Sequence, residues 1–326
     1  MTASACGSSS PPPTGPTTDP PQIACPADVT VTGVAAPSRA VTYAAPVVSK
    51  GAAPVTTTCA PASGATFPLG TTPVTCTASD AMARQASCSF TVTLKGLSIA
   101  AKKYSAIGDS FTEGQNGEPG FVDVPNAYPT KLQLALDMTY PNQGIVVLNH
   151  GAAGSGQPIS VIDQNVKTFV RADRPDVVLL EGGYNDLLSD CGNGPTNTVA
   201  CRDAIGRVPV GYRDCIRHAR EGSTTVQFVF AATLTPPGPH LPGVNDRRIS
   251  NDAILQTNTG IRQTVANEGA VLVDMYPLFV GHEAEYVDSD GLHLRPAGYQ
   301  VMADAFFAAI QKTVPQTPLF GFSVPR

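Results

Sequence analysis

The pattern of hydrophobic and polar positions changes once along the chain, near residue 98. Before this point, short runs alternate apolar and polar residues and are separated by Gly and Pro, as at residues 29–32, 73–78 and 88–94. Alternation with a period of two places the apolar side chains on one face of a strand. Several short strands between Gly/Pro turns are typical of a β-sandwich. We therefore predict an all-β domain over residues 22–97.

After a short joint at residues 98–102, continuous apolar runs alternate with longer stretches of mixed polarity. The apolar runs are residues 104–107, 145–148, 177–180, 226–231 and 271–273. Such runs are typical of strands buried on both faces of a parallel sheet. Helices are predicted at residues 129–139, 211–220 and 247–267, and a last helix from about Pro296. The pattern predicts an α/β domain over residues 103–315 and a tail at 316–326.

Composition and charge favour an exported protein and argue against a nucleic-acid partner. Charged residues make up 14% of the 326 residues, and Gly and Pro contribute 30 each. So small a charged share, against about 25% in ordinary soluble domains, favours a loop-rich exported protein. The formal net charge is -5 and no Lys/Arg run is present. We therefore expect no nucleic-acid partner.

The eight cysteines indicate disulfides, because the chain has no Cys-x-x-Cys and no nearby histidine pair that would favour zinc. Disulfides imply an oxidising compartment, so we expect export to the periplasm or the extracellular space. The four cysteines of the all-β domain allow three pairings, of which we favour Cys25–Cys88 and Cys59–Cys76. Of the remaining Cys191, Cys201 and Cys215, a Cys191–Cys201 bond is preferred.

The first 21 residues are too polar and Pro-rich to pack, which predicts a tether. Within it, Ala-Ser-Ala-Cys6 followed by Gly-Ser-Ser-Ser resembles the end of a bacterial lipoprotein signal, which implies a membrane anchor through lipidated Cys6. The other interpretation is an incidental cysteine in a linker. No run of 18 apolar residues occurs, so we expect that the given chain neither spans a membrane nor carries a complete export signal.

Four polar blocks each follow a predicted strand of the α/β domain. They contain Ser110, Gly154, Asn185 and, near the end of the chain, Asp290 with His293. Because ligands of an open parallel sheet bind at the carboxyl ends of its strands, we expect these blocks to converge. A serine becomes a nucleophile only when a base takes its proton. The spacing of three lets Asp290 orient the His293 imidazole while its other nitrogen faces Ser110.

In this order, the four blocks resemble the SGNH (GDSL-like) hydrolase family, whose serine, glycine, asparagine and histidine correspond to Ser110, Gly154, Asn185 and His293. The resemblance covers about residues 103–313 and implies a three-layer, flavodoxin-like parallel sheet. It implies ester hydrolysis through an acyl-enzyme, with Ser110 as nucleophile, His293 as base and then acid, and Asp290 as its orienting group. The Ser110 and Gly154 N–H groups and the Asn185 side chain would form the oxyanion hole. We expect no metal and no organic cofactor.

The all-β domain resembles a hyalin repeat (HYR), an immunoglobulin-like module, in the segments that begin at Cys25, Phe67 and Ala86. The resemblance implies an immunoglobulin-like sandwich. No polar cluster suited to chemistry falls inside the domain. We therefore expect a spacer, or an adhesive module for cell-surface or matrix components.

The predicted function is that of a serine esterase acting on short-chain or acetylated carbohydrate esters, with lysophospholipids or lipids as further substrates. The alternative is a non-catalytic adhesion or carbohydrate-binding surface protein. Residues 187–210 show no clear secondary structure, and we expect a long loop there beside the substrate cleft.

Other polar residues near the four blocks receive no catalytic role. Asp109 and Asp186 are expected to tie loops together, and Glu113 and Glu181 to flank the cleft. The remaining histidines are expected to be surface or wall residues, and only His282 has an acidic neighbour in sequence, Glu283.

Overall fold

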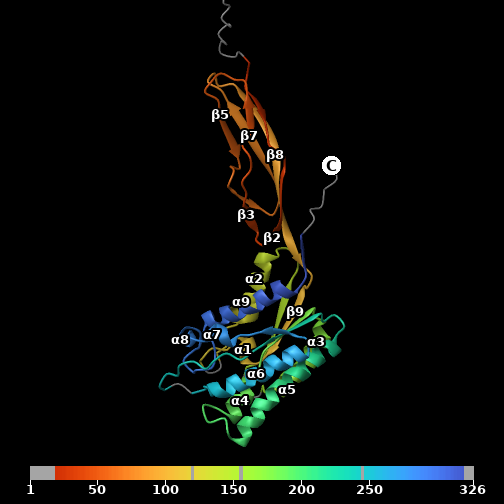
Figure 1. The fold of residues 1–326 in the computed structure, drawn as a ribbon, viewed down its shortest axis with the longest axis vertical. Coiled ribbons are helices and arrows are strands. Elements are labelled where there is room, and N and C mark those ends of the chain that lie inside the picture. The colour runs from red at the N-terminus through yellow and green to blue at the C-terminus, as the bar shows by residue number, and fades with distance from the viewer. Residues whose placement is uncertain (1–18, 119–120, 154–156, 244–245, 319–326) are drawn as a thin grey trace, which may run out of the picture. The chain divides into compact units, whose positions relative to one another are not determined.

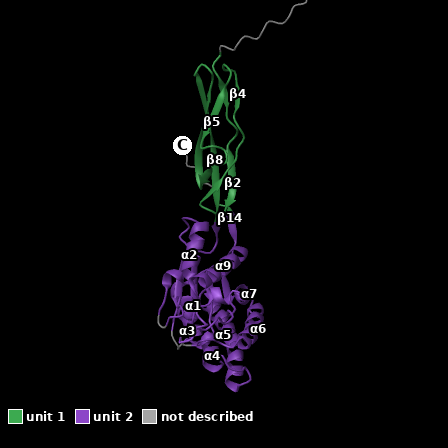
Figure 2. Ribbon diagram, turned by 90° about the vertical axis from the view of Figure 1, so that its left-hand side faces the viewer, with its two compact units in different colours: residues 1–97, 318–326 green, residues 98–317 purple. Residues whose placement is uncertain are grey.

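The computed structural model describes residues 19–118, 121–153, 157–243 and 246–318. The chain divides into two compact units, residues 1–97 with 318–326 and residues 98–317 (Figure 2). Residues 1–18, which hold most of the expected tether and its lipidated Cys6, lie outside the described residues. The expected contribution of Gly154 and the tail from residue 319 onward lie outside them as well.

The first unit consists of strands. They are β1 (Gln22–Ala24), β2 (Val29–Val34), β3 (Ser38–Ala40), β4 (Val47–Ser49), β5 (Thr56–Ala60), β6 (Thr66–Pro68), β7 (Gly70–Ser79) and β8 (Gln85–Ile99). Strands β5, β7 and β8 form an antiparallel sheet to which β2 adds in parallel, and β1–β4 and β3–β6 form two further pairs. The all-β prediction is confirmed.

Alternation along β7 and β8 builds the core of this unit. Val74, Cys76 and Ala78 of β7 are buried, and so are Phe90 and Val92 of β8. Both expected disulfides are present. One joins Cys25, just after β1, to Cys88 of β8, and the other joins Cys59 and Cys76, which are direct partners on β5 and β7.

The second unit is built on a five-stranded parallel sheet. Its strands are β9 (Lys103–Gly108), β10 (Val146–Gly151), β11 (Val177–Leu180), β12 (Phe228–Ala232) and β13 (Val271–Val273), in the order β10-β9-β11-β12-β13. All five predicted strands are confirmed. The order is flavodoxin-like, and its reversal between β9 and β11 opens a crevice at their carboxyl ends.

Helices cover both faces of this sheet. Along the chain they are α1 (Ser110–Glu113), the 3-10 helix η1 (Val124–Asn126), α2 (Tyr128–Thr139), α3 (Ile159–Asp173), α4 (Tyr184–Asp190), α5 (Val199–Gly222), α6 (Asn251–Asn267), α7 (Tyr276–Phe279), α8 (Glu283–Tyr286) and α9 (Pro296–Thr313), followed by the short strand β14 (Gln316–Pro318). Helix α2 packs on α9, and α5 packs on both α3 and α6, so that the two groups lie on opposite faces of the sheet (Figure 1). The predicted three-layer α/β fold is confirmed. None of the helices that the structure describes is long and apolar enough to cross a membrane.

The prediction of a long loop at residues 187–210 is wrong. Helix α4 continues to Asp190 and α5 begins at Val199, so the connection is short. Pro209 inside α5 obscured the helix, because a proline removes one helical hydrogen bond and normally interrupts the pattern. The helix persists because its buried face, which includes Val208 and Tyr212, packs between α3 and α6.

Candidate active site

Ser110 is placed by the turn at the end of β9. The strand ends at Gly108, and the Asp109 side chain accepts the Phe111 N–H at 3.1 Å, which caps the short helix that starts with Ser110. Glycine is required at 108, because a Cβ there would lie 2.2 Å from the Thr112 hydroxyl oxygen. Ser110 is therefore held at the carboxyl end of a central strand.

Ser110, His293 and Asp290 form a continuous chain of short contacts. The Ser110 Oγ lies 2.9 Å from His293 Nε2, and His293 Nδ1 lies 2.6 Å from Asp290 Oδ2. The other Asp290 oxygen accepts the N–H groups of Leu292 and His293, both at 3.0 Å. Burial opposes ionisation of Asp290, but the hydrogen bond and charge of His293 hold its pKa below the ordinary value. The carboxylate can therefore stay ionised and fix the imidazole orientation.

The loop that carries Asp290 is braced by the segment that follows β12. Gly238 and Arg247 donate their backbone N–H groups to the carbonyls of Gly291 and Asp290, both at 3.0 Å. Gly291 has a φ of 77°, and a Cβ there would lie 2.3 Å from Arg248 Cγ. Only glycine fits this left-handed position, which sets the distance between Asp290 and His293.

Asn185 enters the same pocket from the start of α4. It follows Gly182 and Gly183, whose φ angles are 149° and 106° and where a Cβ would collide with Ile162 and Val208. The Asn185 amide donates one hydrogen bond to the Gln157 carbonyl at 3.3 Å. An amide nitrogen has two N–H groups, so one stays available for a ligand.

The pocket brings the predicted serine, histidine and asparagine together. Its lining residues are Ser110, Gln115, Tyr184, Asn185, Leu188, Arg247, Leu292 and His293, around a volume of about 10 Å³. At its base, the Phe111 and Tyr184 rings stack with centroids 4.0 Å apart, and the Tyr184 hydroxyl lies 3.1 Å from that of Thr235. The stack fixes α1 against α4, so that Ser110 and Asn185 keep their separation.

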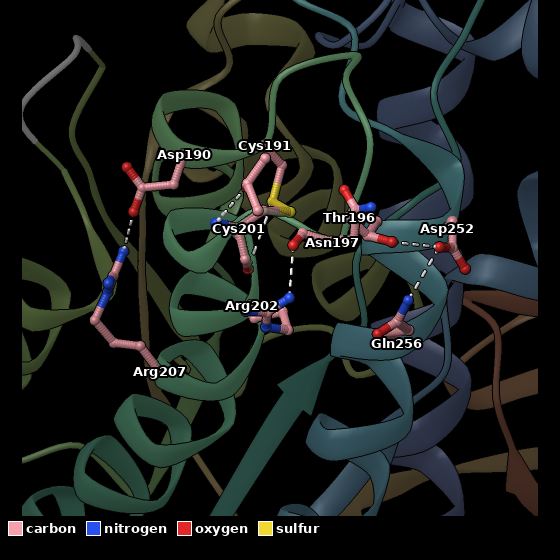
Figure 3. The surroundings of a disulfide bond; sticks show 10 residues. Asp190, Cys191, Thr196, Asn197, Cys201, Arg202, Arg207, Asp252 and Gln256 are labelled. Atoms are coloured by element: carbon pink, nitrogen blue, oxygen red, sulfur yellow. Dashed lines mark hydrogen bonds and ion pairs between the residues drawn. A yellow bond between two sulfur atoms is a disulfide. The ribbon is translucent and has the colours of Figure 1, made fainter.

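Helix α4 is clamped at both ends. Asp186 accepts the Ile159 N–H at 2.8 Å, and Arg207 of α5 donates to Asp186 at 2.9 Å and to Asp190 at 2.8 Å. The expected role of Asp186 as a tie between segments is confirmed by these contacts. The predicted disulfide Cys191–Cys201 then joins the end of α4 to the first turn of α5 (Figure 3). The third cysteine of this unit, Cys215, is buried and free.

Two buried carboxyl groups, Asp109 and Glu181, lie near Ser110. Asp109 was expected to tie loops together and Glu181 to flank the cleft, but neither expectation included a carboxyl pair. Asp109 Oδ2 and Glu181 Oε1 have no donor among the described residues, and the two side chains interact with each other. The second Glu181 oxygen accepts the Thr112 hydroxyl at 2.8 Å. Burial raises the pKa of Asp109 to about 6, and burial together with the Asp109 charge raises that of Glu181 well above its ordinary value. Two interacting carboxyls that each have one oxygen without a donor are expected to share a proton.

His293 is the one histidine among the described residues that line the pocket, although the backbone of His240 forms an isolated β-bridge with Asp290. Two other histidines have acidic partners that local spacing could not reveal. His150 lies 2.7 Å from Asp173, and His218 lies 2.6 Å from Asp163. The acidic partner of His282 is Glu285, at 3.6 Å, and not the expected Glu283. Glu113 approaches the second block, since it accepts the Ala153 N–H.

A serine, a histidine and an aspartate thus meet at the carboxyl edge of a flavodoxin-like parallel sheet. Residues 106–301 match the model of the GDSL-like lipase/acylhydrolase family, and residues 16–94 match the HYR domain. The chain belongs to the GDSL-like lipase/acylhydrolase family. Both resemblances predicted from the sequence are thereby confirmed.

Individual relatives are distant. The spore germination lipase LipC of Bacillus licheniformis is 24% identical over 215 residues, which cover 64% of this chain and 95% of LipC. An α/β hydrolase from the metagenome of Lake Arreo, Spain, is 21% identical, with a TM-score of 0.48 over 66% of this chain and 96% of its own. The acetylxylan esterase Axe2 of Geobacillus stearothermophilus is 19% identical, with a TM-score of 0.49 over 65% and 94%.

Proposed function

We propose that this protein is a serine esterase that hydrolyses carboxylic esters through an acyl-enzyme. The observation that carries the proposal is the unbroken contact from Ser110 through His293 to Asp290, at 2.9 and 2.6 Å. In the first step His293 Nε2 takes the Ser110 proton while Oγ attacks the ester carbonyl carbon. The protonated imidazole then gives this proton to the departing alkoxide, which leaves as the alcohol.

In the second step water replaces the alcohol. His293 accepts one proton of the water, whose oxygen attacks the acyl carbon, and the proton returns to Ser110 Oγ as the carboxylic acid leaves. Asp290 keeps Nδ1 protonated throughout. The Ser110 backbone N–H and the free Asn185 amide N–H are the proposed donors to the oxyanion, with Gly154 proposed as the third.

We further propose that the acyl group is short. The pocket is narrow, with a volume of about 10 Å³, and so small a space favours a short acyl group over a long chain. Short-chain esters, with acetylated carbohydrates among them, are the proposed substrates. The lipase activity in the name of LipC keeps lipid esters as the second candidate within the same chemistry.

Three disulfides and the HYR match support export, and the division into two units supports separate roles. We propose residues 22–97 as a spacer or adhesive module and residues 103–315 as the catalytic domain. A fragment that begins at Ser98 should then keep its kcat/KM on small soluble esters within about threefold. A folded fragment without turnover would contradict this division.

Labelling with a fluorophosphonate serine probe tests the function directly. We expect one adduct, located on Ser110 by peptide mapping and absent after heat denaturation. A panel of 4-nitrophenyl esters from acetate to palmitate, with acetylated xylo-oligosaccharides, then ranks the acyl groups. Absence of both labelling and turnover would favour the non-catalytic surface protein, whereas a maximum at long chains would favour the lipase.

A further inference from the structure

Arg247 stands out among the residues that line the Ser110 pocket, because it is the only cation in the lining apart from a protonatable histidine. It is partly buried. Its backbone N–H donates to the Asp290 carbonyl at 3.0 Å, so the position of its Cα is tied to the loop that carries Asp290 and His293. The backbone hydrogen bond that positions Arg247 thus also holds the loop of Asp290 and His293.

The guanidinium of Arg247 has no hydrogen-bond or ion-pair partner within residues 19–318 as far as the structure describes them. Its neighbour Arg248 is bonded to Asp246 at 2.9 and 2.7 Å, and Arg207 is bonded to Asp186 and Asp190. A guanidinium remains charged at every physiological pH and presents five N–H donors. Withdrawing a charge from water costs free energy unless a counter-ion offsets it, and no carboxylate is among the described residues that line the pocket. The carboxylate of Asp290, whose backbone contacts Arg247, is already engaged by His293.

We infer that Arg247 forms an anion subsite, and that the preferred ester carries a carboxylate close to its ester carbonyl. This inference rests on the proposed esterase function and specifies its substrate class. A carboxylate fits because it accepts two parallel N–H bonds from one guanidinium and carries one negative charge, which the single arginine of the lining can balance. A phosphate would bring more charge than this subsite matches.

The carboxylate can belong to the alcohol or to the acyl part of the ester, and two matched substrate pairs distinguish these sources. For the alcohol part, 3-acetoxybenzoate is compared with its methyl ester. For the acyl part, mono-(4-nitrophenyl) succinate is compared with 4-nitrophenyl methyl succinate. At pH 7 and low salt, we expect kcat/KM in one pair to favour the anionic ester by roughly 10- to 100-fold, the effect of a hydrogen-bonded charge pair.

Substitutions assign this preference to the guanidinium. Arg247→Gln should remove the preference for the anionic ester, and Arg247→Lys should keep part of it, because the charge remains but the paired N–H geometry is lost. Arg171→Gln is the matched control. Arg171 is exposed on α3 and also lacks a partner among the described side chains, so its loss removes the same charge from outside the pocket. The control should keep the wild-type ratio.

Wild-type ratios near one in both pairs, or an unchanged ratio in Arg247→Gln, would overturn the inference. Calorimetric titration of Ser110→Ala with the same esters separates it from the proposed function, because binding requires no turnover. Tighter binding of the anionic ester, lost in the Ser110→Ala/Arg247→Gln double variant, would support the subsite even for an inactive protein. Equal binding of charged and neutral esters would refute it.

Discussion

Asp80 in the first unit and Asp109 in the second are both buried aspartates, yet their pKa values move in opposite directions. Burial alone would raise the pKa of Asp80, but hydrogen bonds from the Arg84 side chain and from the Ala52, Arg84 and Met82 backbone lower it to about 2. Asp109 receives one backbone N–H, and its other oxygen faces Glu181. Burial therefore dominates and raises the pKa of Asp109 to about 6.

The difference shows how each unit uses buried polarity. Among the described residues, Asp80 is the only buried ionisable side chain of the first unit, and it is surrounded by donors. The second unit buries four carboxyl groups and one imidazole among its described residues, namely Asp109, Glu181, Asp186, Asp290 and His293. A carboxylate with enough donors stabilises a fold, whereas carboxyls that lack donors reduce its stability and are typical of reactive sites. Four predictions test this contrast, from the largest expected effect to the smallest.

Ser110→Ala should produce the largest change, because the buried polar groups of the second unit are proposed to serve one reaction. We expect kcat on 4-nitrophenyl acetate to fall roughly 10⁴- to 10⁶-fold. His293→Ala should match it, and the double variant should lose little more, since nucleophile and base act as one unit. Circular dichroism should show an unchanged fold. Independent, multiplicative losses would argue against a joint mechanism.

Asn185→Ala should have the next largest effect. Loss of one oxyanion donor should lower kcat roughly 10²- to 10³-fold and change KM much less, because the bond strengthens in the transition state. The bond from Asn185 to the Gln157 carbonyl gives a competing purely structural role. In that case the melting temperature would fall while the folded fraction kept normal turnover. Measuring kcat and the melting temperature of this one variant decides between the two roles.

The parts of the fold that could be predicted are those encoded in neighbouring residues. The strands of the second unit were predictable because each is a continuous apolar run, and those of the first because apolar and polar residues alternate along them. Ser110, Asn185 and His293 were predictable because each stands in a short polar block after a strand or before the last helix. Helix α5 was predicted only over residues 211–220, because Pro209 interrupts the pattern of its first half and packing against α3 and α6 maintains the helix there.

Contacts between residues far apart in sequence could not be predicted in the same way. Asp109 and Glu181 meet because β9 and β11 are neighbours in the sheet, and no local spacing encodes that pairing. The partner of His150, Asp173, lies at the end of α3, a helix that the sequence analysis did not predict. The free Arg247 was missed because the absence of a partner is visible only when every neighbour is in place.

Asp80→Asn tests the structural side of the contrast. A carboxylate whose folded pKa is lowered contributes stability above its unfolded pKa, near 4, and loses it as pH falls toward about 2. The amide that replaces the carboxylate is uncharged and cannot form an ion pair with Arg84. At pH 7 the melting temperature of the first unit should therefore be at least about 4 °C lower in the variant than in the wild type. At pH 2 the two proteins should differ little. Calorimetry that finds the same difference at both pH values would exclude the charge as the cause. Turnover should not change.

Glu181→Gln tests the opposite side and should stabilise the second unit. A carboxyl whose folded pKa is raised is stabilising in its protonated form, so stability is full below the unfolded pKa, near 4, and is lost as pH rises through the folded values. For Asp109 that value is about 6, and Glu181 is shifted upward with it. The glutamine of this variant can donate an N–H to Asp109 at every pH. The Asp109–Glu181 pair has such a donor only while it holds the shared proton.

We therefore expect Glu181→Gln to raise the melting temperature of the second unit by roughly 2–4 °C at pH 8, about the effect of 1 kcal/mol in a unit of this size, and to leave it nearly unchanged at pH 4. Glu118→Gln is the control, because it makes the same change at an exposed position. A gain of equal size at both pH values would mean that packing, not the shared proton, is responsible. A loss at both would mean that the Glu181 carboxyl is a satisfied acceptor like that of Asp80, and the contrast between the two units would then disappear.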